Sequence, residues 1–101
     1  MTAFNVQFKD IFRPAREPAR AIYDALMDEA TMRKTRTVDE WIAAEELAVL
    51  NAATAVAEKY GLTVPTMEQV RSAERCARGS ADYCAKWVTT LTNMMTPRSI
   101  Q

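Results

Sequence analysis

Two helix-start signals, each followed by a long amphipathic stretch, constrain the fold of this chain more than any other feature. Thr37 and Thr66 each stand three residues before a side chain that can reach back, Glu40 and Gln69 respectively. In this arrangement, called a capping box, the two side chains satisfy backbone N–H groups that a helix leaves free at its start. The sequence therefore predicts that one helix begins near Thr37 and another near Thr66.

Apolar residues after each signal recur at steps of three and four, which is the spacing of one helix face. The first stretch reaches Gly61, which can adopt the left-handed conformation that ends helices. The second passes through Gly79 and stops at Pro97, which cannot continue a helix. We expect helices over 37–60 and 66–95, the second one continuous, with Gly79 as the place where it would kink.

A third helix and an N-terminal arm complete the expected organisation. Apolar spacing predicts a helix over 18–34, whereas residues 4–8 alternate like a short strand in an arm over 1–17 that either covers the core or engages a partner. Two glycines and four prolines are too few for the repeated turns of a β-sandwich or barrel. We expect a single all-α domain over 1–101, a small three-helix bundle with a long antiparallel helical hairpin and a tail over 96–101 that frays from Arg98 onwards.

The chain contains no histidine, the side chain that activates many serine and cysteine nucleophiles and that most often ligates zinc. Its two glycines are far apart, so neither a phosphate-binding loop nor a dinucleotide fingerprint is present. Carboxylates cluster on the expected helices, but the chain lacks the histidines that accompany such carboxylates in the metal sites of di-iron bundles. We therefore expect no catalytic residue, no cofactor and no metal, and a protein that is not an enzyme.

The cysteines and the hydropathy pattern bear on localisation. Cys76 and Cys84 are eight residues apart, which is about 12 Å on a continuous helix and beyond the reach of a disulfide. Free thiols are typical of a reducing compartment. No secretory signal is apparent, and no stretch approaches the roughly 20 apolar residues that cross a bilayer. We expect a cytoplasmic protein without membrane contact.

Residues 56–75 resemble the helix-turn-helix of bacterial transcription regulators. The resemblance rests on a small residue at the helix contact, a glycine at the turn and apolar residues in the second helix: Ala57, Gly61, Leu62, Met67 and Val70. It implies that the second helix enters the major groove of DNA. The DNA-contacting residues that it implies are Gln69, Arg71, Ser72 and Arg75.

Basic side chains also recur along the expected second helix. Arg71, Arg75, Arg78 and Lys86 fall within roughly 80° of one another around its axis. Such a row is either a solvated face paired with acidic neighbours or a surface that docks on an acidic protein or a phosphate backbone. Flexible thioethers suit adaptable contacts, so the predicted partner-binding residues are this row together with two methionines near the helix end, Met94 and Met95.

Charge and alanine content predict how the helices associate. Residues 37–60 carry five acidic side chains and one basic side chain, whereas both flanking segments are net positive, which favours antiparallel packing around the acidic helix. The stripe along the expected last helix consists mostly of small residues: Val70, Ala73, Ala77, Ala81, Cys84, Val88, Leu91 and Met95. Because such a seam buries little area, we expect a homodimer.

These observations favour a module that binds another macromolecule. A short, histidine-free chain with alanine-rich, capped helices has the general look of accessory proteins encoded by phages or mobile elements, including small inhibitors of host defence systems. That likeness favours an accessory or inhibitory protein acting on a host protein complex. The alternative is a helix-turn-helix DNA-binding transcriptional regulator, although the net charge of zero gives no overall attraction to DNA.

Overall fold

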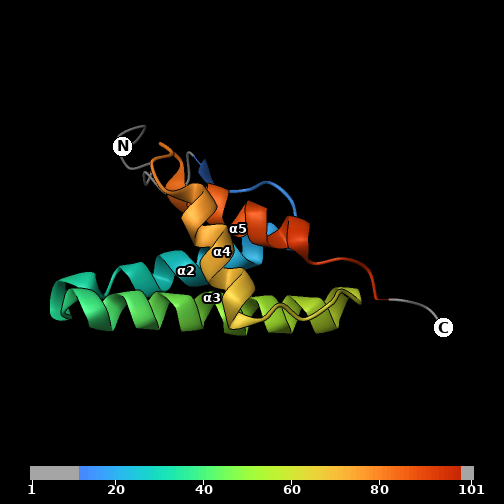
Figure 1. Ribbon diagram of the computed structural model, residues 1–101, viewed down its shortest axis with the longest axis horizontal. Helices are drawn as coiled ribbons and strands as arrows, with labels where there is room; N and C mark the ends of the chain where they lie inside the picture. The colour runs from blue at the N-terminus through green and yellow to red at the C-terminus, as the bar shows by residue number, and fades with distance from the viewer. Residues whose placement is uncertain (1–11, 99–101) are drawn as a thin grey trace, which may run out of the picture.

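The computed structural model describes residues 12–98, and over this range the chain is a bundle of four α-helices (Figure 1). The helices are α2 (Ala19–Ala30), α3 (Val38–Tyr60), α4 (Met67–Ala77) and α5 (Tyr83–Met94), with a 3-10 turn, η2 (Arg33–Thr35), before α3. The all-α class predicted from the sequence is confirmed. Between residues 12 and 98 no helix combines the length and the apolar character of a membrane span.

Both predicted capping boxes form. Thr37 Oγ1 accepts a hydrogen bond from the Glu40 backbone N–H, and the Glu40 carboxylate accepts one from the Thr37 N–H. Thr66 and Gln69 make the same reciprocal pair of bonds at the start of α4. At the other end of α3, Gly61 has a φ of 68°, the left-handed conformation predicted for it.

The expectation of one continuous helix over 66–95 is wrong. The backbone leaves the helical conformation at Arg78, where ψ is 137°, and Gly79 has a φ of 85°, so α5 folds back against α4. The apolar spacing persists across the break because both helices direct that stripe into the same core. Continuing the helix through Gly79 would leave Trp87 without cover, whereas folding back buries it together with Val88 at a gain of several kcal/mol.

Two other boundaries differ from expectation. The helix predicted over 18–34 ends at Ala30, after which a turn and η2 lead into α3. Fraying is expected from Arg98, but the Arg98 N–H donates to Gly61 O at 2.9 Å, and just before it the Thr63 N–H donates to Thr96 O at 2.8 Å. The rest of that segment, 99–101, lies outside the described residues. The strand pattern over 4–8 lies outside the described residues.

The core lies between α2, α3 and the α4–α5 pair. Figure 1 shows α2 running antiparallel beside α3, while α4 crosses α3 and α5 returns over α2. The buried residues of this core are mostly aliphatic or small: Ile22, Tyr23, Leu26, Val49, Ala53, Val56, Ala57, Val70, Ala73, Ala77, Ala85, Trp87, Val88, Leu91 and Met95. Most of the small-residue stripe that motivated a dimer is therefore used inside the monomer, and self-association stays a prediction.

Candidate functional site

The predicted basic row is divided between two helices. Arg71, Arg75 and Arg78 lie on or just after α4, whereas Lys86 lies on α5 beyond the turn. Each of the three arginines meets a carboxylate, as shown by the closest N–O distances: Arg71 to Glu46 at 3.3 Å, Arg75 to Glu68 at 3.2 Å and Arg78 to Glu74 at 2.8 Å. The row is exposed but locally neutralised, and its role in partner binding stays a prediction.

The two methionines near the chain end are not the exposed contacts that we expected. Met95 is buried in the core, and Met94 is half-buried and packs against it. Met94 is the last residue of α5 and Met95 follows it directly, so the fold-back of α5 brings both over the rest of the bundle. Their thioethers fill gaps in the core, so they are removed from the candidate partner surface.

The segment that resembles a helix-turn-helix has a distinct geometry. Residues 61–66 separate α3 from α4 and run back along α3 (Figure 1), whereas the motif joins its helices by a turn of three or four residues. The side chain of Gln69 is engaged in the cap of α4, and Ser72 is half-buried. Of the four implied DNA-contacting residues, the two arginines are the exposed ones, and both are ion-paired.

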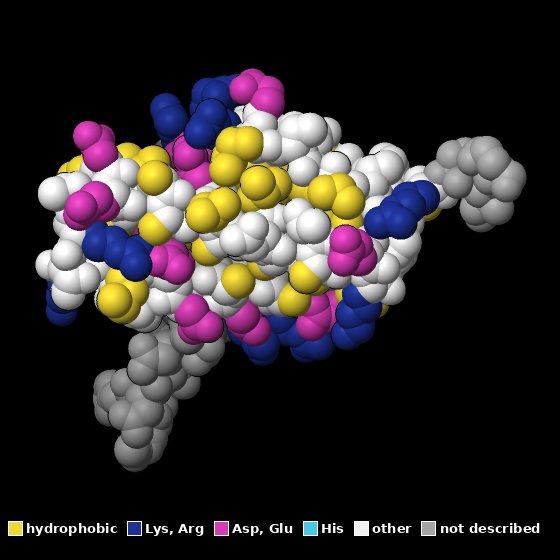
Figure 2. All heavy atoms as spheres, turned by 90° about the horizontal axis from the view of Figure 1, so that it is seen from below, with side chains coloured by type: hydrophobic (Ala, Val, Ile, Leu, Met, Phe, Trp, Pro, Cys, Tyr) yellow, Lys and Arg dark blue, Asp and Glu magenta, His cyan; other side chains and the backbone are white. Residues whose placement is uncertain are grey.

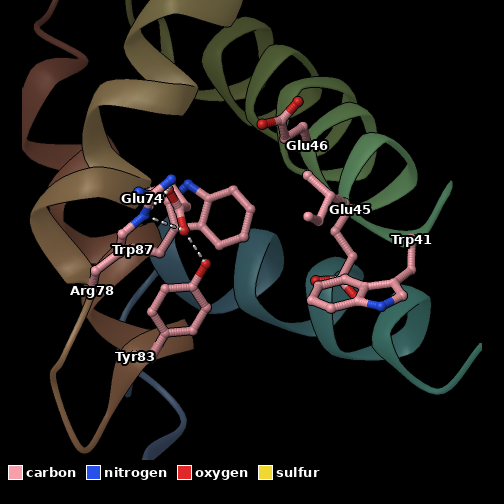
Figure 3. A pocket seen from close by; sticks show the side chains of 8 residues that line it. Trp41, Glu45, Glu46, Glu74, Arg78, Tyr83 and Trp87 are labelled. Atoms are coloured by element: carbon pink, nitrogen blue, oxygen red, sulfur yellow. Dashed lines mark hydrogen bonds and ion pairs between the residues drawn. The ribbon is translucent and has the colours of Figure 1, made fainter. Parts of the chain in front are cut away.

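A pocket of about 120 Å³ lies between α3 and the α4–α5 pair (Figure 3). One wall comes from α3, and the opposite wall comes from α4, the following turn and α5. Both tryptophans of the chain line the pocket. The lining residues are Trp41, Ile42, Glu45, Glu46, Glu74, Arg78, Tyr83 and Trp87.

Behind the α3 wall, a buried carboxylate forms an ion pair with a partly exposed arginine. Glu45 is 2 % exposed at its side chain, and it accepts two hydrogen bonds from Arg33, at 2.6 Å and 2.7 Å. The Arg33 guanidinium also lies 4.1 Å from the centre of the Trp41 ring, a cation–π contact. Hydrogen bonding to Glu45 raises the pKa of Arg33 above its ordinary value. This corner of the molecule therefore binds a guanidinium between a carboxylate and an indole.

The opposite wall is organised around Glu74. Arg78 donates to this carboxylate at 2.9 Å, and the Tyr83 hydroxyl donates to it at 2.6 Å (Figure 3). Burial acts to raise the pKa of Glu74, but these two hydrogen bonds outweigh it, and the pKa lies below its ordinary value. Burial and the bond to Glu74 raise the pKa of Tyr83, which keeps the phenol protonated as a donor.

Trp87 completes the aromatic lining. Its indole N–H donates to the Val70 carbonyl at 3.0 Å, and its ring lies 5.9 Å from that of Tyr83. Because the polar edge of Trp87 is satisfied by backbone, its ring face is the part that can contact a ligand. The sequence did not reveal this pocket because Glu74, Tyr83 and Trp87 meet only after the turn at Gly79.

A second hollow of about 180 Å³ lies beside Phe12, Tyr23 and the turn at 81–85. Cys84 lines it, and burial raises the pKa of its thiol, which disfavours the reactive thiolate. Within the described part of the chain both cysteines are free, as expected, although that expectation rested on a continuous helix. No group of three potential ligands that could hold a metal ion occurs among residues 12–98.

The outward side of α3 carries an uncharged surface. Ala43, Leu47, Asn51 and Ala55, at four-residue steps, are all exposed, and Leu47 retains 51 % of its exposure. We call these four residues the outer face of α3. Figure 2 shows the molecule from this side, with hydrophobic and uncharged side chains across its middle and charged groups towards the edges.

Comparison of the chain with protein-family models, curated proteins and solved structures finds no match.

Proposed function

We propose that this chain is a non-enzymatic protein-binding module and that the outer face of α3 docks on its partner. The observation that carries the proposal is the absence of charge from this face. A solvated helix face usually carries charged side chains, whereas this one presents Ala43, Leu47, Asn51 and Ala55 over three turns. A single exposed leucine is common on protein surfaces, so the support for a docking surface comes from the whole uncharged face and not from Leu47 alone.

The spacing of the outer face defines the kind of partner element that fits it. Side chains at four-residue steps form a ridge along a helix, and small residues in the ridge allow a second helix to approach closely. Glu40 and Glu58 bound the uncharged face at its two ends, about 27 Å apart at the helical rise. Neither carboxylate is ion-paired to any residue of 12–98. The partner is therefore a helix with an apolar face and basic flanks.

A protein partner accounts for the geometry better than DNA does. Phosphate contacts through α4 would first have to open the pairs that Arg71 and Arg75 make with Glu46 and Glu68. Docking through α3 requires no such rearrangement. The partner in this proposal belongs to a host protein complex, on which the chain acts in the accessory or inhibitory role that the sequence favours.

The proposal is tested by affinity capture from a bacterial lysate with three baits. They are the unaltered chain, Leu47→Glu, which places a charge in the outer face, and Thr89→Glu, which places one on the exposed side of α5. Because Leu47 is half-exposed, the substitution leaves the core intact. We expect the same protein to be retained by the unaltered chain and by Thr89→Glu, and to be lost with Leu47→Glu.

Two outcomes would contradict the proposal. One is a partner that binds Leu47→Glu as well as it binds the unaltered chain. The other is sequence-selective retention of a DNA duplex at nanomolar protein near physiological salt, lost on replacing Arg71 and Arg75, which would favour the regulator. Circular dichroism of each variant checks that the helices are retained.

A further inference from the structure

We propose that the pocket between α3 and the α4–α5 pair is a binding site for the guanidinium group of an arginine side chain presented by the partner protein. This inference extends the proposed function. The pocket and the outer face lie on different sides of α3: Trp41, Ile42 and Glu45 line the pocket, whereas Leu47 points outward. Each site can therefore be tested without the other.

The lining contains three carboxylates, and each of them is already held in an ion pair. Glu45, Glu46 and Glu74 line the pocket, against a single lining cation, Arg78. Arg33 and Arg71, which pair with the first two carboxylates, are not part of the lining. An incoming cation therefore reaches a carboxylate by displacing the cation that holds it, and Arg78, which is itself part of the lining, is placed for that exchange.

The ring surfaces favour a flat organic cation over a metal ion or a simple ammonium group. Trp41 lies on one side of the pocket, and Tyr83 and Trp87 lie on the other (Figure 3). A guanidinium can stack on such rings and also donate two parallel hydrogen bonds to a carboxylate, which an ammonium group cannot do. Arg33 already adopts this mode in the same corner, against Trp41 and Glu45.

The pocket has an open side, and one of the side chains that line it can be displaced by a ligand. Ile42 on the rim is 41 % exposed and Val38, one turn earlier, is 60 % exposed, so apolar surface flanks the entry. Arg78, whose side chain is 67 % exposed, holds Glu74 through a pair that water screens. An incoming guanidinium can take the place of Arg78 on Glu74, while Tyr83 keeps this carboxylate oriented.

The test uses two probes that differ in charge but hardly in shape, N-acetyl-arginine amide and N-acetyl-citrulline amide. The two tryptophan indole N–H resonances of the chain are followed by NMR during titration, with Trp41→Phe used for assignment. We expect saturable shifts with the arginine probe, with a dissociation constant on the order of 1 mM for so small a fragment, and no saturation with the citrulline probe.

Two variants on the Glu74 wall should move the affinity in opposite directions. Glu74→Gln removes the carboxylate and should weaken the arginine probe about threefold or more, whereas Arg78→Ala removes the competing cation and should strengthen it by a similar factor. Glu17→Gln and Arg20→Ala remove a partly exposed pair at the start of α2 outside the pocket and should change nothing. A purely structural disturbance would weaken binding in both pocket variants.

The inference is overturned if the citrulline probe binds as tightly as the arginine probe, if neither saturates, or if Arg78→Ala weakens binding. None of these outcomes bears on the outer face of α3, because the probes are free small molecules and Leu47 does not line the pocket. Conversely, Leu47→Glu should leave the affinity for the arginine probe unchanged.

Discussion

Glu45 is the one charged residue that is almost fully buried among residues 12–98, and its position depends on a single partner. Both of its oxygens accept hydrogen bonds from Arg33, the first residue of η2, whose guanidinium also contacts the Trp41 ring. A buried carboxylate without a partner is strongly unfavourable, since its desolvation is no longer compensated. The local order of the turn before α3 therefore depends on Arg33.

Replacing Arg33 with alanine is expected to lower the free energy of unfolding by about 2 kcal/mol. The value lies below the loss typical of a fully buried pair because the Arg33 side chain is 37 % exposed. Urea denaturation measures it. Arg75→Ala, which breaks an exposed pair, is the control and should cost less than about 0.5 kcal/mol. Equal losses in the two variants would show that the burial of Glu45 has no energetic consequence.

Glu74 gives the stability a dependence on pH. Its pKa in the folded chain lies below the ordinary value of 4.5, because hydrogen bonds from Arg78 and Tyr83 outweigh the opposing effect of burial. As the pH falls, the unfolded chain therefore takes up the proton first, and the stabilisation by the carboxylate is lost as the pH passes through the folded pKa. At neutral pH this stabilisation is fully present.

We expect the stability difference between the unaltered chain and Glu74→Gln to be constant above about pH 6 and to shrink below about pH 4.5. Urea denaturation between pH 3 and pH 7 measures this difference, with the range set by the ordinary carboxyl pKa. Glu68→Gln, at an exposed carboxylate on the same helix, controls for the general acid loss. A difference that grows as the pH falls would have the wrong sign for a lowered pKa.

At the scale of elements, a substitution in the turn between α4 and α5 distinguishes one continuous helix over 66–95 from two helices joined at Gly79. If residues 66–95 formed one helix, Gly79→Ala would raise the free energy of unfolding by about 1 kcal/mol, because alanine is the better helix former. In the structure Gly79 has a φ of 85° and an added Cβ would meet nothing within 4 Å, so the cost comes from the backbone alone. We expect a loss of about 1–2 kcal/mol in chemical denaturation. A gain in stability would contradict the break at Gly79 and support one continuous helix over 66–95.

At the scale of the whole molecule, the remaining apolar surface sets how copies of the chain meet. The outer face of α3 is bounded by Glu40 and Glu58, so two copies that met through it would bring carboxylates together in either orientation. Self-association through this face should therefore be weak at low salt and strengthen as salt screens the repulsion.

Light scattering at tens of micromolar protein, from about 0.05 M to about 0.5 M salt, tests this expectation. The average mass should rise with salt, and Leu47→Glu should abolish the rise because it places a further charge in the contact. A dimer that dissociates as salt is added would require a contact made of opposite charges, and a different surface.

The sequence by itself determined where three of the four described helices begin and what class of fold they build. Threonine followed by Glu40 or Gln69 forms a cap within one turn of chain, and Gly61 ends α3 through its own backbone freedom. These interactions join residues a few positions apart, so they are present in the local sequence whatever the rest of the chain does. The start of α2 near residue 18 was expected from apolar spacing alone, and the Glu17 carboxylate supports it locally by accepting from the Ala21 N–H. The start of α5 has no side-chain cap.

Only the tertiary structure decided that the last helix divides and which side chains share the pocket. Apolar spacing of three and four residues is the same for a continuous helix and for two helices packed on one core, so it does not distinguish them. The choice depends on burial of Trp87 against α4, a contact between residues 17 positions apart. The same fold-back buries Met95, pairs Tyr83 with Glu74 and opens the pocket towards Trp41, because burial rewards contacts that local spacing does not encode.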